Sequence, residues 1–286
     1  MNSLLDSFYN VVGFLNGIVW SDWLVYLCLL AGIYFTVVTR FVQIRKFPEM
    51  IRMIFGKKES ASNEGVSSYQ SFMITVAARV GTANIVGVAV AIAYGGPGSV
   101  FWMWVLAILG AATSFAECTL AQVYKFELDG EYRGGTTYFI DKALHAKWLA
   151  MIFAVLTAIA FSVAGPGVHS NAMSSALELT FGIDPTITGI VLVVLMGFVS
   201  MGGVKRLASV AEKITPVMAI IYLLLTVILM VVNVTEIPRV IGMIVGSAFG
   251  QDAMFGGILG SALSYGIMRG IYSNEAGMGT ATMAAA

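Results

Sequence analysis

The sequence predicts an all-α polytopic membrane protein with two discontinuous helices. Of the 286 residues, 58% are hydrophobic and only 11% are charged, and the mean hydropathy is +0.85. A soluble domain averages ~25% charged residues. Several apolar runs approach the ~20 residues that a helix needs to cross a bilayer. Polar residues interrupt two of these runs, which indicates helices that are broken inside the membrane.

Residues 1–22 predict an amphipathic helix that lies in the membrane interface. Apolar residues recur there at helical spacing, and Asp6, Asn10 and Asn16 fall between them. An ordinary helix packed on the bundle would give the same pattern. Residues 23–69 predict a peripheral first span followed by a basic cytoplasmic loop.

Residues 70–235 predict a repeat of five spans, of which the first is broken. Turns and polar loops separate apolar runs that are long enough to cross with some tilt. Including the peripheral span, we expect spans at residues 23–41, 72–94, 100–124, 148–168, 187–201 and 216–234. Residues 236–286 begin a second repeat, with a short apolar segment and then a last element that starts near Gly256.

The positions of Lys and Arg predict the orientation in the membrane. Thirteen of the 16 basic residues fall in three loops that share one side if the spans alternate. These are Arg40, Arg45, Lys46, Arg52, Lys57, Lys58, Lys125, Arg133, Lys142, Lys147, Lys205, Arg206 and Lys213. Cytoplasmic loops carry an excess of Lys and Arg. We therefore expect the N-terminus outside, in a plasma membrane that would be the inner membrane of a bacterium.

The first break lies between the apolar runs 72–78 and 85–94. It contains Arg79, Gly81, Thr82 and Asn84. Arginine is costly at bilayer depth, and irregular backbone is tolerated there only where protein buries it or where it lines a cavity. A polar break at this depth is typical of a transporter's binding site. A glycine-kinked helix with a buried polar pair is the structural alternative.

The last element has a similar break within the sequence GIMRGIYSNEAGMG. Residues of the first break match residues of this segment at a constant interval: Ser71 with Ser261, Arg79 with Arg269, Asn84 with Asn274, Gly87 with Gly277 and Ala91 with Ala281. The topology makes the two broken helices run in opposite directions, which is typical of an inverted repeat. Only one span of the second repeat precedes Ala286, so we expect an incomplete repeat and a chain that needs further helices to complete a transport cycle.

Two motifs resemble those of the alanine or glycine:cation symporter family, also called sodium:alanine symporters. They are GGPGSVFWMWVLAILG at residues 95–110 and SNEAGMG at residues 273–279. The resemblance covers most of the chain from about Gln70 and includes RVGTANIVGVAVAI, FAECTLAQVY and DGEYRGG. It implies a LeuT-like fold. It also implies symport of alanine, glycine or a similar small neutral amino acid with Na⁺, or with H⁺, by alternating access.

The resemblance and the two breaks together give the candidate site. The candidate substrate-binding residues are Gly81, Thr82, Ala83, Asn84, Phe161, Gly165, Ser273, Asn274 and Gly277. The candidate Na⁺ ligands are Val80, Ala83 and Asn84, and the candidate charge partners are Arg79, Arg269 and Glu275. Phe161 and Gly165 are expected to limit the pocket size, with a packing role as the alternative. The candidate carboxylate Glu275 could hold the substrate ammonium group, relay a proton or pair with an arginine.

Some positions depart from the family pattern or receive no functional role. Ala83 stands where the family has glycine, and the family pattern has Asn and Gln near Pro166 and His169. We expect His169 near the outer surface and assign it no chemistry. We expect Glu117 to be a structural hydrogen-bond partner.

The composition and the motifs argue against several classes of function. The net charge is zero, so no basic excess points to nucleic acid, and the absence of a catalytic dyad argues against an enzyme. Na⁺ is expected as the coupling ion, with no organic cofactor, and a monomer is expected. A channel would need a continuous polar pore, which the two short polar breaks do not supply. A membrane fragment or sensor that binds an amino acid without transporting it is the alternative to a symporter.

Overall fold

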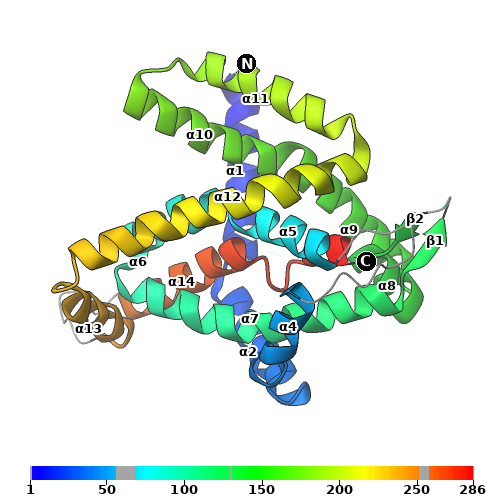
Figure 1. Ribbon diagram of the computed structural model, residues 1–286, viewed down its shortest axis with the longest axis horizontal. Helices are drawn as coiled ribbons and strands as arrows, with labels where there is room; N and C mark the ends of the chain where they lie inside the picture. Colours follow the sequence, from blue (N-terminus) through cyan, green and yellow to red (C-terminus); the bar gives the residue numbers. More distant parts are fainter. Residues whose placement is uncertain (1, 56–67, 129–130, 251–257, 286) are drawn as a thin grey trace.

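The computed structural model describes residues 2–55, 68–128, 131–250 and 258–285, and most of them are helical (Figure 1). The helices are α1 Asn2–Val19, α2 Asp22–Val38, α3 Val42–Arg45, α4 Phe47–Phe55, α5 Ser68–Arg79, the π-helical turn η1 Ala83–Gly87, α6 Val88–Gly95, α7 Gly98–Val123, α8 Thr136–Leu144, α9 Lys147–Ile159, the π-helical turn η2 Ala160–Ala164, α10 Gly165–Phe181, α11 Pro185–Ser200, α12 Gly203–Val232, α13 Ile237–Ala248, α14 Ile258–Asn274 and α15 Ala281–Ala285.

The helices have the lengths and composition of a multi-pass membrane protein. Four helical runs are long and apolar enough to cross a bilayer: Asp6–Val38, Gly98–Val123, Lys147–Phe181 and Arg206–Val232. The bent pair Tyr69–Arg79 and Ala83–Gly95, whose two parts meet at 49°, makes a fifth when it is counted as one span. The prediction of a broken helix at this position is therefore confirmed.

Two spans are longer than the sequence suggested. The expected span at 148–168 continues to Phe181, because Pro166 falls in the first turn of α10, where a missing N–H is tolerated. The expected span at 216–234 begins at Gly203, so Pro216 lies inside α12. Membrane helices accept an internal proline when neighbouring groups satisfy the freed carbonyl.

The polar loop between α7 and α9 contains regular structure that the sequence analysis did not predict. Strands β1 Phe126–Leu128 and β2 Glu131–Arg133 form an antiparallel hairpin in which Phe126 pairs with Arg133. Helix α8 follows the hairpin. In the described part of the chain this hairpin is the only sheet. The expected start of the last element near Gly256 lies outside the described residues.

Helix α7 is the centre of the molecule and contacts α2, α6, α13, α14 and α15. A buried apolar cluster joins α2, α7 and α14 through Val25, Leu106, Ile267 and Ile271. Figure 1 shows α14 beside α7, with α5 and α12 on the other side of α14. The two broken helices therefore lie close to the same central helix.

Glycines allow α7 and α14 to approach one another closely. A Cβ atom built on Gly266 would lie 2.6 Å from the Ser99 carbonyl oxygen. A Cβ atom on Gly110 of α7 would lie 2.7 Å from the Cβ atom of Ala276, which follows the end of α14. Small residues at helix contacts are typical of membrane proteins, where close backbone packing replaces the hydrophobic driving force.

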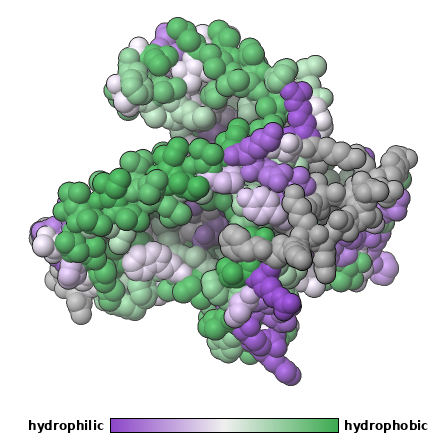
Figure 2. Space-filling model, in the orientation of Figure 1, coloured by the Kyte–Doolittle hydropathy of each residue, from purple (hydrophilic) through white to green (hydrophobic). Residues whose placement is uncertain are grey.

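Large apolar side chains cover much of the outer surface. Figure 2 shows hydrophobic residues over α10, α11 and α12, and Leu179 of α10 is 88% exposed. Hydrophilic residues gather over α4 at the bottom of the view. Soluble monomers rarely expose so large an apolar surface, whereas a lipid-facing surface requires one.

Candidate functional site

The first break separates α5 from η1 at residues 80–82. The Asn84 backbone N–H donates to the Gly81 carbonyl over 3.1 Å, and the Gly81 N–H donates to Asn84 Oδ1 over 3.5 Å. The second of these distances is at the long limit for a hydrogen bond. The Asn84 side chain is therefore only weakly engaged by its own turn, although the sequence analysis had allowed for such a local role.

The second break covers residues 275–280, between α14 and α15. Glu275, Gly277 and Gly279 have φ angles of 51°, 88° and 72°. These left-handed conformations end the α14 helix, and they are unfavourable for Glu275, which is not a glycine. Thr280 Oγ1 donates to Glu275 Oε2 over 2.8 Å and so bridges the break.

The polar residues of the two breaks match at a constant interval in the sequence, but the backbone interruptions do not. Asn84 follows the first break, in η1, whereas its match Asn274 is the last residue of α14 and precedes the second break. The constant interval between matched residues therefore locates polar groups near each break. It does not locate the backbone interruption itself.

A cavity of about 330 Å³ lies between the two broken helices. Its volume is in the range of small-molecule sites. Five candidates from the sequence line it together: Arg79, Val80, Asn84, Ser273 and Asn274. The other lining residues are Phe72, Thr75, Val76, Ala107, Ala111, Ser114 and Ala276. Residues far apart in the sequence thus meet in one partly polar cavity, as the two breaks predicted.

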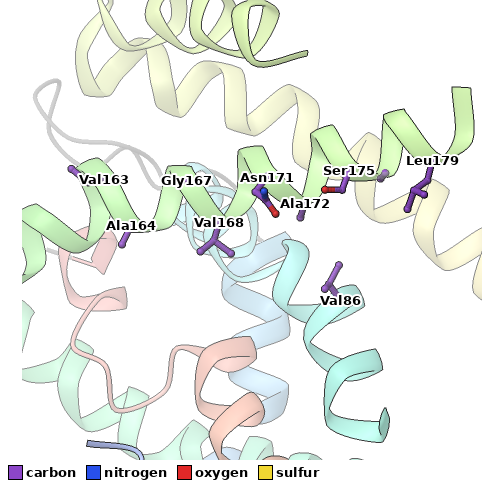
Figure 3. A pocket seen from close by; sticks show the side chains of 10 residues that line it. Val86, Val163, Ala164, Gly167, Val168, Asn171, Ala172, Ser175 and Leu179 are labelled. Atoms are coloured by element: carbon purple, nitrogen blue, oxygen red, sulfur yellow. The ribbon is translucent and has the colours of Figure 1, made fainter. Parts of the chain in front are cut away.

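A second, wider groove of about 740 Å³ runs along α10 (Figure 3). Val86 of η1 faces it from across the groove, and Val168, Asn171 and Leu179 line the α10 side. Its lining is mostly apolar. Phe161 and Gly165 are not among the residues that line either of these two cavities, and the Phe161 side chain is 47% exposed.

The Arg79 side chain is held by α7. Arg79 Nη2 donates to Ser114 Oγ over 2.7 Å. Arg79 Nε and Glu117 Oε2 are both buried and have no hydrogen-bond partner among the described residues. Glu117 lies one turn beyond Ser114, within electrostatic range of Arg79, and its carboxylate also interacts with the Gly279 backbone N–H. The sequence analysis assigned Glu117 a structural role but did not connect it with Arg79 or the second break.

The three predicted charge partners do not form salt bridges with one another. The structure shows Glu275 bonded to Thr280, while the described salt bridges are Lys46–Glu49 and Arg239–Glu236 on the surface. Arg269 is partly buried in α14. The carboxylate near Arg79 is therefore that of Glu117 and not that of Glu275.

Helix α10 reaches the first break through His169. The Thr82 Oγ1 atom and the His169 Nδ1 atom are 2.7 Å apart, and either group can donate according to the imidazole tautomer. A Cβ atom on Gly81 would lie 3.4 Å from His169 Cε1. The sequence analysis assigned no chemistry to this histidine, because no motif links residue 169 with residue 82.

A buried threonine network joins α8 to the second break. The Thr136 N–H donates to Thr282 Oγ1 over 3.1 Å, and Thr136 Oγ1 donates to the Gly279 carbonyl over 2.8 Å. Gly135, at the start of α8, has a φ angle of 117° that glycine adopts readily. The loop that contains the DGEYRGG motif therefore leads directly to a contact with the second broken helix.

One carboxylate outside the spans stabilises a helix start. Asp184 Oδ1 accepts the Thr186 N–H over 2.7 Å at the N-terminus of α11. Hydrogen bonds with the Thr186 side chain and backbone hold the pKa of Asp184 below its usual range. Such a cap satisfies a backbone N–H that has no partner within the helix.

Comparison with known proteins identifies the family. The model of the sodium:alanine symporter family matches residues 5–286. The chain is 51% identical to a putative sodium/proton-dependent alanine carrier protein of Bacillus subtilis, over 95% of this chain and 56% of that protein. It is 45% identical to a probable sodium/glutamine symporter of the same organism, over 97% of this chain and 58% of that protein.

An archaeal relative gives the same result. The chain is 40% identical to a sodium/alanine symporter of Methanococcus maripaludis, over 98% of this chain and 63% of that protein. The chain therefore spans somewhat more than half the length of these curated relatives. The family expected from the sequence motifs is confirmed: the chain belongs to the sodium:alanine symporter family.

Proposed function

We propose that the protein acts in a secondary active symporter that couples Na⁺ entry to uptake of a small neutral amino acid such as alanine or glycine. The cavity of about 330 Å³ between the two broken helices is the observation that carries this proposal. Discontinuous helices around a site at the middle of the membrane are typical of secondary transporters. The names of the relatives support an amino acid as substrate, because they specify alanine and glutamine.

The helix ends at the cavity provide complementary groups for an amino acid and a cation. Backbone N–H groups at the start of a helix carry partial positive charge, which suits the substrate carboxylate. The Asn84 N–H already donates to the Gly81 carbonyl, so we assign the carboxylate to the N–H groups of Gly81 and Thr82 and to the side-chain amide of Asn84. Carbonyl oxygens at the end of α14, near Ser273 and Asn274, carry partial negative charge, which suits the substrate ammonium group.

The proposed Na⁺ site lies at the same break, beside the substrate carboxylate. Na⁺ is a hard cation that prefers oxygen ligands, by the same logic as Ca²⁺. We assign it to the carbonyl oxygens of Val80 and Ala83 and to the amide oxygen of Asn84. The weak 3.5 Å contact between Asn84 Oδ1 and the Gly81 N–H leaves this oxygen available for a stronger interaction. A LeuT-like inverted repeat, a monomer and an external N-terminus complete the proposal.

The test is the substitution Asn84→Ala in the full chain, with alanine binding measured by isothermal titration at several Na⁺ concentrations. Loss of a buried polar contact costs ~1–3 kcal/mol, so alanine affinity should fall roughly 5- to 150-fold. Asn233→Ala is a matched control, because the exposed Asn233 side chain donates to the Leu229 carbonyl in α12 and has no other hydrogen bond among the described residues. Unchanged affinity and Na⁺ dependence in Asn84→Ala would sink the site assignment.

Transport itself needs a separate measurement. Alanine accumulation by the purified protein in liposomes, under an imposed Na⁺ gradient and not under a K⁺ gradient, would support symport by this chain alone and contradict the expectation that further helices are needed. Binding without accumulation would favour the non-transporting alternative for this chain.

A further inference from the structure

The contact between His169 and the first break joins two helices that are far apart in the sequence. His169 lies in α10, and Thr82 lies between α5 and η1. Their side chains are 2.7 Å apart at Nδ1 and Oγ1, which is a short hydrogen bond. The imidazole edge also lies against Gly81, because a Cβ atom there would be 3.4 Å from His169 Cε1.

The first break needs support from side chains outside its own turn. The Val80 N–H still donates to the Val76 carbonyl over 2.8 Å, but the chain bends by 49° between Arg79 and Ala83, so a regular helix does not continue through the break. The local bond from the Gly81 N–H to Asn84 Oδ1 is 3.5 Å long. The bond between Thr82 and His169 is much shorter, and it ties the break to a separate helix.

His169 is not among the residues that line the cavity between the two breaks. Its neighbours Val168 and Asn171 line the wider groove along α10 instead (Figure 3). The histidine therefore contacts the break without lining the cavity that Asn84 lines. A side chain in this position can set the backbone geometry of the site through Thr82.

We propose that His169 is a positioning residue for the first break. Its hydrogen bond to Thr82 holds residues 81–84 in the orientation that presents their polar groups to the amino acid. The identity of the substrate in this inference rests on the proposed function. The contact between His169 and Thr82 does not depend on that function. A glutamine at position 169 can replace the bond, since its amide both donates and accepts, but a leucine cannot.

The experiment compares His169→Leu, His169→Gln, Thr82→Val and the double variant His169→Leu/Thr82→Val in the full chain. Amide hydrogen exchange of peptides that cover residues 79–88 reports on the break without substrate, and titration with alanine reports on binding. His169→Leu and Thr82→Val should each speed exchange in this segment and weaken alanine binding about 2- to 10-fold. His169→Gln should restore both properties, and the double variant should be no worse than either single one.

Thr226→Val is the matched control for Thr82→Val. Thr226 Oγ1 bonds the Tyr222 carbonyl within α12, so its loss should leave the break unchanged. Thr82→Val removes only a hydroxyl and keeps the inference testable if His169→Leu does not fold. The inference would be overturned if hydrogen exchange were unchanged in Thr82→Val. It would also be overturned if the effects of the two substitutions added up in the double variant, or if His169→Gln did not restore exchange and alanine binding. Failure of the unmodified chain to bind alanine would count against the proposed function, while the exchange results would still decide the role of His169.

Discussion

The substitution Gly266→Ala tests the close contact between α7 and α14. The added Cβ atom would lie 2.6 Å from the Ser99 carbonyl oxygen and 2.8 Å from the Trp102 Cβ atom. Cβ atoms in real proteins essentially never approach another heavy atom closer than 3.0 Å. Both obstacles are backbone or the first side-chain atom, so they cannot move aside by a rotamer change. The two helices must separate instead.

Two opposing effects set the change in stability caused by Gly266→Ala. Forcing an extra methyl group into a packed contact typically costs ~1–3 kcal/mol. Replacing glycine by alanine inside a helix returns up to ~1 kcal/mol through helix propensity. We therefore expect a net destabilisation of about 1–2 kcal/mol. A chain of this size should then lose roughly 2–6 °C of apparent Tm.

The assay is thermal unfolding of the purified variants in one detergent, followed by the fluorescence of a thiol dye or of tryptophan. Gly189→Ala is the matched control, because no atom lies within 4 Å of a Cβ atom built on Gly189 in α11. This control should be neutral or slightly stabilising. A Tm for Gly266→Ala equal to or above that of Gly189→Ala would show that the contact is not close-packed.

Two further substitutions test contacts outside the cavity. Thr136→Val removes the buried hydroxyl that donates to the Gly279 carbonyl and lies 2.9 Å from Thr282 Oγ1, so the Tm should fall by the equivalent of ~1–3 kcal/mol. Thr119→Val should show little change, because the Thr119 hydroxyl donates to the Phe115 carbonyl of its own helix. Asp184→Ala removes a helix cap. Because the folded state lowers the pKa of the Asp184 carboxyl, the cap stabilises the protein fully above the usual pKa of about 4. This stabilisation is lost as the pH falls through the lower pKa of the folded state. The difference in Tm between this variant and the unmodified chain should therefore be largest near neutral pH and vanish in strong acid.

The sequence predicted the broken helices because their signal is local. A polar cluster around Arg79 and Asn84 inside an apolar run has few structural solutions in a membrane, and an interrupted helix is one of them. The expected end of the span at residue 168 was wrong, because the α9–η2–α10 run continues to Phe181. Gly165, Pro166 and Gly167 look like a stop signal, but the structure uses them as the first turn of α10.

The contacts that connect the breaks with other helices could not be predicted from one sequence. His169 and Thr82 are 87 residues apart, and Arg79 and Ser114 are 35 residues apart. Such contacts depend on how the helices cross, which hydrophobic periodicity does not specify. The spacing of matched residues did indicate which polar groups would meet at the cavity, and the second interruption lies within the segment 266–279 that was expected to be broken. The left-handed residues Glu275, Gly277 and Gly279 put that interruption just after Asn274.

The glycine contacts between α7 and α14 also limit the kinds of motion available to the molecule. Packed helices slide in shear motions through small adjustments of the side chains between them. At Gly266 there is no side chain to adjust, since its backbone lies directly against the backbone of Ser99. We therefore expect α7 and α14 to move as one rigid body. Opening and closing of the cavity must then come from bending at the interruptions and from tilting of α9 to α12, which pack less closely around this pair.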